Sequence, residues 1–478
     1  MSRKTEFDIG IIGGGAAGLV VAAGAATLGA KAVMVEKNAL GGDCLYYGCV
    51  PSKTLLHSAK TAHIHRSSGR FGIPPTEPNI KLGVVMDRVQ EVIRTIEPND
   101  SPERFRAMGV NVIFGEGRFI DTRTFDVAGV KLNARKFVLA TGTRPAVPPI
   151  EGIETVPYLT NETVFSLREN VSELIVVGAG PIGCEMAQAF ARLGTRVHVV
   201  DIAPQILIKE DADMADVVQA SLRRDGVQLY LGHTFVRVEG KEGDIRVLLM
   251  DRDRREIELH GSHLLVAAGR KPNLENLGLE KAGVGLENGR LISDKRLRTT
   301  NKNIYACGDV VGPYLFTHMA EHHAGVVLRN ALFHFPAHVE SRVIPWCTYT
   351  DPELARVGLS ETEARQLGID YRIYTFPFAD VDRAIAEGET SGMAKIIASP
   401  RGRLLGAAIV GPHAGELIHE YVLALAKGMK LSDLSSIIHI YPTLAQINRR
   451  AADQRLKEAL TPARRKWIKR LFGLRGAV

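Results

Sequence analysis

The stretch FDIGIIGGGAAGLVVAAGAATLGAKAVMVE, residues 7–36, decides the fold of the chain. Read in order, it predicts a buried strand at Phe7–Ile12, a turn at Gly13–Gly18, an alanine-rich helix to about Leu28, and a second strand at Ala32–Val35. The run from Ile9 to Ala30 carries no charge, but Gly and Ala dominate it, and Glu6 and Asp8 precede it. We therefore expect neither a membrane span nor a signal sequence here.

The glycine spacing is that of a dinucleotide-binding turn. Gly13, Gly15 and Gly18 lie between a strand and a helix, and an acidic residue, Glu36, follows 23 residues after Gly13. Backbone N–H groups at such a helix start can hold a pyrophosphate, while the acid accepts hydrogen bonds from ribose hydroxyls. The stretch therefore predicts a Rossmann-like unit.

The same unit recurs further along the chain. In order, the second copy has a strand at Leu174–Val177, a turn with Gly178, Gly180 and Gly183, a helix at Glu185–Leu193, and a strand at Arg196–Val200. That strand ends in Asp201, again 23 residues after the first glycine. A chance double match at identical spacing is improbable, so we expect two bound dinucleotides.

Three connecting segments accompany the two units. Phe137–Pro145 and Leu265–Pro272 are matching strand-to-turn segments, one closing each unit. The third, Asn303–Asp309, is a strand that ends in a carboxylate. The proline-rich segment 145–149 predicts a linker into the second unit, and the chain is expected to return to the first unit near Lys271.

The remaining segments have other patterns. His57 to about Phe114 is expected to be mostly helical and polar. From about Ile344, alternating strand patterns at Ala394–Ala398 and Leu404–Val410 precede an apolar helix at Glu416–Ala426. This part predicts an α+β domain without a nucleotide site of its own.

With 478 residues, the chain is too long for one ordinary domain. The predicted fold class is α/β, with two Rossmann-like domains and a C-terminal α+β domain. The expected boundaries are 1–149 for the first part of the first Rossmann domain, 150–270 for the second Rossmann domain, 271–343 for the rest of the first, 344–460 for the α+β domain and 461–478 for a basic tail.

Two cysteines five positions apart occupy the stretch GGDCLYYGCVPSK, residues 41–53. An ideal helix would hold the Cα atoms of Cys44 and Cys49 roughly 8 to 9 Å apart, which is too far for a disulfide, so the turn must be distorted. Gly48 permits the distortion, and Pro51 suits the first turn of the next helix. Cys49 then lies near a helix N-terminus, which stabilises a thiolate that attacks disulfides or binds soft metals.

The other three cysteines, Cys184, Cys307 and Cys347, are expected to be small buried apolar residues. Five cysteines in a chain of this length do not form a secreted disulfide scaffold. Their sparse use fits a reducing compartment in which one pair cycles between thiol and disulfide.

Positive charge is concentrated at the C-terminus. The whole chain has a net charge of +7, whereas residues 449–478 alone contain ten Lys/Arg and two Asp/Glu, a net +8 that leaves −1 for the remainder. On a helix after Thr461-Pro462, Trp467, Ile468, Leu471 and Phe472 would share one face, opposite a cluster of cations. This predicts weak peripheral membrane contact or, alternatively, docking on the protein's own surface; nucleic-acid binding is not expected.

Together, the two fingerprints, the Cys-x4-Cys followed by Val-Pro-Ser-Lys, and the α+β domain resemble the pyridine nucleotide-disulfide oxidoreductases, up to about residue 455. That family includes lipoamide dehydrogenase, glutathione reductase and mercuric reductase. The resemblance implies FAD in the first Rossmann domain, NAD(P)H in the second, and a homodimer formed through the C-terminal domain. It implies a cytoplasmic enzyme, which the tail could place at the inner membrane face.

The resemblance also implies roles for individual residues. FAD would contact Gly13, Gly15, Gly18, Glu36, Lys37, Gly42, Lys53, Gly117, Thr141, Gly142, Asp309 and Thr317. The nicotinamide nucleotide would contact Gly178, Gly180, Gly183, Asp201 and Gly269, with NADH preferred because Asp201 repels a 2′-phosphate. Cys49 would be the thiolate against the flavin and Cys44 the exposed interchange thiol, while Lys53, paired with Glu185, would lie where hydride arrives.

One segment departs from the disulfide-reducing members, which have a His-Pro-Thr followed by Glu. Here Tyr441 replaces that histidine and Gln446 the glutamate. A tyrosine with a pKa near 10 is a poor base at neutral pH. His439 could substitute, or it could support the fold. Tyrosine at this place resembles mercuric reductase, although the C-terminal vicinal cysteines and N-terminal metal-binding domain of that enzyme are absent from this sequence.

The acceptor stays open between several classes. A soft acceptor such as Hg(II), in contact with Cys44 and Cys49, is the first expectation, and no structural metal site is expected. A small disulfide such as lipoamide is the second, and a quinone that takes electrons directly from flavin is the third. A different class altogether is a scaffold that merely retains FAD, and NADH oxidation with any acceptor would distinguish it from the enzymes.

Overall fold

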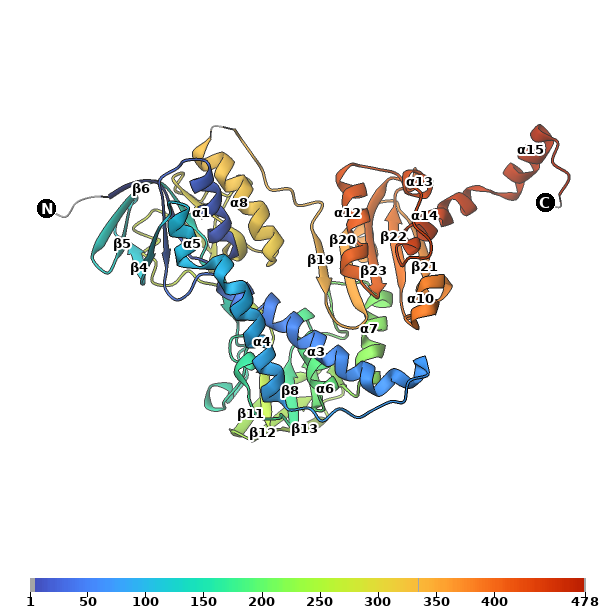
Figure 1. Cartoon of the computed structure of the whole chain (residues 1–478), viewed down its shortest axis with the longest axis horizontal. Helices are drawn as coiled ribbons and strands as arrows, with labels where there is room; N and C mark the ends of the chain where they lie inside the picture. Colours follow the sequence, from blue (N-terminus) through green and yellow to red (C-terminus); the bar gives the residue numbers. More distant parts are fainter. Residues whose placement is uncertain (1–4, 334, 477–478) are drawn as a thin grey trace.

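The computed structural model describes residues 5–333 and 335–476. Three bodies surround a central region, with the first Rossmann fold, the second Rossmann fold and the C-terminal domain each forming one of them (Figure 1). Helices α3 (Cys49–Ser67) and α4 (Leu82–Ile96) leave the first fold and pack beside the second. This arrangement brings the cysteine-bearing end of α3 toward the place where the bodies meet.

The first body is a seven-stranded sheet in the order β3-β2-β1-β6-β5-β4, with β18 paired to β6. Its strands are β1 (Thr5–Ile12), β2 (Ala32–Glu36), β3 (Asn111–Phe114), β4 (Gly117–Phe119), β5 (Thr124–Val127), β6 (Val130–Leu139) and β18 (Ile304–Ala306). Helices α1 (Ala16–Thr27) and α8 (Thr317–Leu332) pack together in one buried cluster. Because β18 belongs to this sheet, the chain returns to the first fold after completing the second.

The second body contains a parallel sheet in the order β10-β9-β8-β14. Its elements are β8 (Glu173–Val177), α6 (Pro181–Arg192), β9 (Arg196–Asp201), α7 (Ala212–Arg224), β10 (Gln228–Leu231) and β14 (His263–Val266), with an antiparallel sheet of β11 (Thr234–Lys241), β12 (Asp244–Met250) and β13 (Glu256–Gly261). Residues 174–177 are all buried, as is typical of a parallel strand covered on both faces.

The two strand-to-turn segments meet each other. After β6 the chain forms β7 (Thr143–Pro145), and after β14 it forms β15 (Arg270–Pro272). These short strands pair antiparallel, with Lys271 opposite Arg144. The entry to the second Rossmann fold and the exit from it therefore run side by side as one two-stranded ribbon.

The C-terminal body is an antiparallel five-stranded sheet in the order β19-β20-β23-β22-β21, covered by helices. Its strands are β19 (Pro345–Thr348), β20 (Glu353–Gly358), β21 (Arg372–Pro377), β22 (Met393–Ala398) and β23 (Leu404–Gly411), and its helices are α9 (Glu361–Gln366), α10 (Asp382–Glu387), α11 (Ala414–Leu417), α12 (His419–Ala426), α13 (Leu431–Ser436) and α14 (Gln446–Ala459). The predicted α+β character is confirmed, while the residue boundaries proposed for the domains stay predictions.

Some local expectations were wrong. The helical expectation holds for α3, α4 and α5 (Pro102–Ala107), but Asn111–Phe114 is a parallel edge strand whose short, partly exposed sequence carries little periodic signal. Helix α6 begins at Pro181, four residues earlier than expected, because proline is accepted in a first turn. The helix expected at Glu416–Ala426 is divided at Ile418 into α11 and α12.

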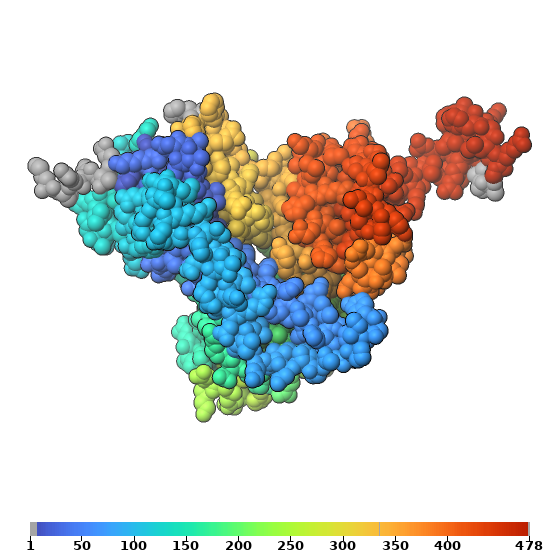
Figure 2. Space-filling model, viewed as in Figure 1, coloured from blue at the N-terminus to red at the C-terminus, as the bar shows by residue number. Residues whose placement is uncertain are grey.

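The tail forms helix α15 (Pro462–Phe472), and the Thr461 hydroxyl accepts a hydrogen bond from the Arg464 N–H at its start. Figures 1 and 2 show α15 projecting beyond the C-terminal body, and none of its residues is buried. Within residues 5–333 and 335–476, no helix is both long enough and apolar enough to cross a membrane.

Candidate functional site

A cleft of about 1570 Å³ lies between the first Rossmann fold, the start of α3, helix α6 and strand β19. Most residues that the sequence assigns to FAD or to electron transfer line it. These are Gly13, Gly15, Glu36, Lys37, Gly42, Cys44, Cys49, Lys53, Gly117, Thr141, Gly142, Glu185, Asp309 and Thr317. Residues far apart in the sequence thus converge on one cavity that is large enough for a dinucleotide.

The glycine turn forms a cradle that leaves no room for side chains. A Cβ atom at Gly18 would lie 1.9 Å from the Gly13 carbonyl oxygen, and one at Gly42 would lie 2.7 Å from the Gly15 Cα. The Glu36 carboxylate accepts hydrogen bonds from the backbone N–H groups of Gly14 (2.7 Å) and Asn38 (2.8 Å), which fix it beside the turn. Close backbone approach and a fixed acid are what the phosphates and ribose of FAD require, so these residues fit that group.

The Asp309 carboxylate lines the cleft and is largely surrounded by protein. Burial raises the pKa of Asp309, and the nearby Arg270 guanidinium partly offsets this. Thr143 Oγ1 donates to Asp309 Oδ2 at 3.3 Å, and Arg270 Nε donates to that same hydroxyl oxygen at 2.7 Å. Asp309 therefore has polar partners on one side and faces the cleft on the other.

The cysteine pair lies at a break between two helices. Helix α2 (Gly42–Tyr46) carries Cys44, and α3 begins at Cys49 after a non-helical Gly48 with φ −120° and ψ −109°. The expected distortion of the turn is therefore present. Thr317 at the start of α8 contacts both sulfur atoms, since its hydroxyl donates to Cys44 Sγ at 3.2 Å and lies 3.7 Å from Cys49 Sγ.

The two thiols are electrostatically different. A hydrogen bond from Cys44 lowers the pKa of Cys49 to about 6; burial opposes this shift, and the Lys53 ammonium adds to it. The same interaction, together with burial, raises the pKa of Cys44. At neutral pH the structure therefore favours a thiolate at Cys49 and a thiol at Cys44.

Lys53 and Glu185 form an ion pair beneath the cysteines. Lys53 Nζ donates to Glu185 Oε2 at 2.9 Å, and the backbone N–H of Tyr349 donates to Glu185 Oε1 at 2.8 Å. The Lys53 ammonium also lies 4.4 Å from the centre of the Tyr349 ring. Burial lowers the pKa of Lys53, but Glu185 outweighs it and raises that pKa, so Lys53 stays charged.

The second fingerprint repeats the geometry of the first. Its three glycines and Asp201 do not line the main cleft, whereas Pro181 and Ile182 of the same turn do. A Cβ at Gly183 would lie 1.9 Å from the Gly178 carbonyl oxygen, whereas the space around Gly180 is open. The Asp201 carboxylate accepts from the N–H groups of Ala179 (2.6 Å) and Ala203 (2.8 Å). Gly269, with φ +135°, precedes the ribbon strand β15.

Tyr441 and His439 do not line the cleft of the single chain. Tyr441 is 66% exposed on the C-terminal body, where its hydroxyl donates to Asp382 at 2.9 Å, an interaction that raises the pKa of Tyr441. The His439 ring faces two acceptors, the Glu420 carboxylate at 2.9 Å and the Ile437 carbonyl at 3.1 Å. Both ring nitrogens of His439 therefore lie against acceptors of the C-terminal body itself, which supports the structural role rather than the catalytic one.

Several cleft residues escaped the sequence analysis. Asp43 pairs with Arg270 at 2.9 Å, and Tyr349 approaches Lys53 from the C-terminal body. Cys347 was expected to be buried, but it is half-buried and lines the cleft beside Tyr349. Asp43 and Arg270 adjoin recognised motifs, which could have drawn attention to them, whereas nothing local marks Tyr349.

The chain matches known proteins over most of its length. Residues 7–324 match the family model described as pyridine nucleotide-disulphide oxidoreductase, and residues 344–452 match the dimerisation domain of that family. A mercuric reductase from Lysinibacillus sphaericus is 35% identical over 93% of this chain and 82% of the relative. A dihydrolipoyl dehydrogenase from Chlamydia muridarum is 34% identical over 92% and 95%.

Solved structures agree on the fold. The Cu(II) complex of the HOCl-induced flavoprotein disulfide reductase RclA from Escherichia coli superposes with a TM-score of 0.85 at 28% identity, covering 94% of this chain and 99% of that one. LpdA from Mycobacterium tuberculosis superposes with a TM-score of 0.84 at 29% identity, covering 95% and 99%.

Proposed function

The chain belongs to the pyridine nucleotide-disulphide oxidoreductase family of enzymes, and from this premise we propose that it oxidises NADH and passes the electrons through Cys44 and Cys49 to a soft metal ion. Members of the family use FAD and NAD(P)H. The match of residues 344–452 to the dimerisation domain supports a homodimer.

One observation carries the proposal: two unlike sulfur atoms share Thr317 at the end of a cleft that also holds the Lys53–Glu185 pair. Bound in that cleft, FAD would supply the two-electron chemistry between nicotinamide and sulfur. The Lys53 charge stabilises the Cys49 thiolate, and Glu185 and Tyr349 hold the lysine in place. Cys44 is the thiol that would meet the acceptor, although in the single chain Cys49 is exposed and Cys44 is only partly exposed, the reverse of the exposure expected from the sequence.

A soft metal ion suits this pair because thiolates are soft ligands. The net reaction with mercury, NADH + Hg(II) → NAD⁺ + H⁺ + Hg(0), needs no proton donated by the protein, which fits a chain with Tyr441 in place of the family's catalytic histidine. Relatives named mercuric reductase, and a fold neighbour solved as a Cu(II) complex, support this class of acceptor.

The direct test is steady-state NADH oxidation by the purified flavoprotein with a panel of acceptors. Hg(II), Cu(II), lipoamide, glutathione disulfide and a soluble quinone should be compared at equal concentration, each with Cys44→Ser as a control. We expect metal-dependent turnover that requires Cys44. Turnover of a quinone alone, unchanged by Cys44→Ser, would contradict the proposal.

A small-disulfide reductase is the second candidate. It is supported by the dihydrolipoyl dehydrogenases, one of which is matched over 95% of its own length. The exposed Tyr441 counts against it, because thiol–disulfide exchange needs a base that tyrosine does not provide at neutral pH. Faster turnover of lipoamide than of any metal ion in the same panel would favour this candidate.

NADH should be preferred over NADPH. Asp201 at the end of β9 is held by two backbone N–H groups where a ribose would bind, and a 2′-phosphate there would meet its negative charge. No arginine follows among residues 202–207 to pair with a phosphate. We expect kcat/KM for NADH to exceed that for NADPH by about tenfold or more, equivalent to ~1.4 kcal/mol.

Asp201→Asn tests the cause of this preference, because it removes the charge and keeps the shape of the side chain. The ratio of kcat/KM for NADH to kcat/KM for NADPH should fall toward one, mainly because kcat/KM for NADPH rises. Glu36→Gln, the matching change in the first fingerprint, should leave the ratio unaltered. A wild-type preference for NADPH would contradict the assignment.

For the tail, the proposal is weak contact with an anionic membrane surface. Trp467, Leu471 and Phe472 are each more than half exposed on α15, and five cations lie between Arg464 and Arg470. Apolar aromatics beside cations suit a lipid interface, and each basic residue near an anionic surface contributes about 1 kcal/mol. Full-length protein should co-sediment with phosphatidylserine-containing vesicles at low salt, and a chain ending at Leu460 should not.

Two comparisons separate the contributions to this binding. Trp467→Ala with Phe472→Ala should weaken binding while leaving its salt dependence, and neutral phosphatidylcholine vesicles should retain little protein. Equal sedimentation of the full-length and shortened chains, or binding indifferent to salt, would contradict membrane contact.

A further inference from the structure

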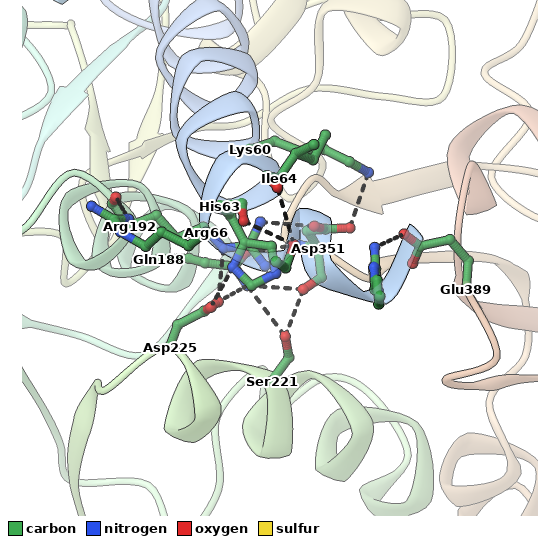
Figure 3. Close-up of polar contacts among 12 residues, drawn as sticks. Lys60, His63, Ile64, Arg66, Gln188, Arg192, Ser221, Asp225, Asp351 and Glu389 are labelled. Atoms are coloured by element: carbon green, nitrogen blue, oxygen red, sulfur yellow. Dashed lines mark hydrogen bonds and ion pairs between the residues drawn. The ribbon is translucent and has the colours of Figure 1, made fainter. Parts of the chain in front are cut away.

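A polar cluster lies away from the cleft, where α3, α6, α7 and the turn between β19 and β20 meet. Gln188, Arg192 and Ser221 are buried in it, whereas Asp351 and Lys60 are partly exposed. Figure 3 shows its members pointing toward one another from these separate elements. Asp351, in the turn, is at its centre and contacts Lys60 of α3, Gln188 and Arg192 of α6, and Ser221 of α7. The chemistry proposed above uses none of these residues.

The backbone of Asp351 is held from both sides. Its N–H donates to Gln188 Oε1 at 2.7 Å, and its carbonyl oxygen accepts from Gln188 Nε2 at 2.9 Å. The Ser221 hydroxyl donates to the same carbonyl at 2.6 Å. The Gln188 amide therefore makes the same pair of hydrogen bonds to Asp351 that a residue on a neighbouring β-strand would make, and it fixes the backbone of the turn.

The Asp351 carboxylate bridges two helices. One oxygen accepts from Lys60 Nζ at 3.1 Å and the other from Arg192 Nη1 at 2.7 Å. Arg192, which is 6% exposed, also donates to Asp225 at 2.9 Å. Burial raises the pKa of Asp351, but the positive charges of Lys60 and Arg192 outweigh burial and lower that pKa below its usual value. The carboxyl group is therefore charged at neutral pH. Asp351 is thus the anion that joins α3 to α6.

The same three elements carry the ion pair of the cleft. Lys53 precedes Lys60 by two turns of α3, and Glu185 precedes Arg192 by two turns of α6, so each pair shares a helix face. Tyr349, whose N–H donates to Glu185, stands two residues before Asp351 in the turn. The Asp351 contacts and the Lys53–Glu185 contacts therefore join the same three elements, namely α3, α6 and the turn between β19 and β20.

We propose that Asp351 is a positioning residue for hydride transfer: by tying the 349–351 turn to α3 and α6, it holds Tyr349 and Glu185 against Lys53. The inference rests on the proposed function and on the expectation, implied by the family resemblance, that Lys53 and Glu185 lie where the nicotinamide delivers hydride. The rate of hydride transfer depends on how the reacting groups are positioned, and a displacement of these groups by about 1 Å can slow the transfer up to 10²-fold.

Asp351→Asn in the full-length, FAD-loaded protein is the principal test. The amide keeps the size of the side chain but removes the charge that joins Lys60 to Arg192. We expect the rate of flavin reduction at saturating NADH to fall about tenfold, with the dissociation constant for NADH changed less than twofold. Asp370→Asn, an exposed aspartate of the same body, is the matched control and should leave the rate unchanged.

The thiol side supplies a readout that a general loss of structure would also alter. After reduction, the cysteine pair of Asp351→Asn should react with a chromogenic aromatic disulfide at the wild-type rate. Ser221→Ala, which removes only one hydrogen bond to the turn, should slow flavin reduction two- to fivefold and serves as the milder variant. Equal slowing of both half-reactions, or of neither, would overturn the inference.

A double-mutant cycle with Glu185→Gln separates this inference from the function on which it rests. If Asp351 acts through Glu185, adding Asp351→Asn to Glu185→Gln should slow flavin reduction by less than twofold further. Fully additive effects would show that Asp351 acts elsewhere and would reject the positioning role. If Glu185→Gln alone leaves flavin reduction unaltered, the proposed role of the Lys53–Glu185 pair fails first.

Discussion

Replacing Cys49 with serine is expected to reduce acceptor-dependent NADH oxidation by at least about 10³-fold, the scale seen when a residue that forms a covalent bond in a reaction is removed. The reason is that Cys49 carries the lowered pKa, so serine supplies neither a thiolate nor a sulfur that can pair with Cys44. NADH should still reduce the flavin, because the Lys53–Glu185–Tyr349 contacts do not involve the Cys49 sulfur. Rapid-reaction spectroscopy separates the two steps.

The same variants have a spectroscopic signature. A thiolate against oxidised flavin gives a long-wavelength absorbance, which Cys49→Ser should abolish and Cys44→Ser should display without added reductant. In wild-type enzyme reduced by two electrons, this band should be present above pH 6 and disappear as the pH falls through about 6, because acid protonates the thiolate. Cys184→Ala, which removes a fully buried thiol, should leave the band intact. An unaltered spectrum in both serine variants would refute the assignment.

The change Tyr441→His with Gln446→Glu should raise lipoamide reduction by as much as about 10²-fold, the lower end of what a positioned acid–base group contributes. Tyr441 now bonds to Asp382, and the Gln446 amide donates to the carbonyls of His439 and Ile440, so neither side chain provides a base. A histidine at position 441, paired with a glutamate at position 446, would provide such a base. The measurement is kcat/KM for lipoamide across pH, where the double variant should lose activity on acidification as its imidazole protonates.

His439→Gln is the control for that experiment. Because both His439 ring nitrogens already face acceptors, we expect lipoamide turnover to be unchanged within about threefold, apart from any loss of stability around Glu420. Rapid lipoamide turnover by the wild-type enzyme that disappears in His439→Gln would instead identify His439 as the base.

Both dinucleotide folds could be predicted from sequence because their signals are local. Strand, glycine turn, helix and terminal acid occupy one continuous stretch, and Glu36 and Asp201 indeed lie against their own turns. The distorted segment between Cys44 and Cys49 was predictable for the same reason. The short edge strand Asn111–Phe114 was not, since its position depends on pairing with β2 rather than on its own residues.

The rest of the site could not be predicted because it depends on distant contacts. Tyr349 reaches Glu185 only when the C-terminal body packs against α6, and Asp43 meets Arg270 only when the ribbon forms. Cys347 looked like a core residue, yet β19 ends at the cleft wall, which leaves that sulfur half-buried. The residue pattern within one segment does not predict contacts that form only when separate parts of the chain pack together.

The ribbon of β7 and β15 has a consequence for engineering. Since the chain enters and leaves the second Rossmann fold through paired strands, residues 146–269 begin and end side by side and could be transplanted between homologous enzymes as a cassette. A donor segment would change the nucleotide preference while the flavin-side scaffold stays native. It would need to retain Glu185, Gln188 and Arg192, because these side chains dock the cassette onto its host.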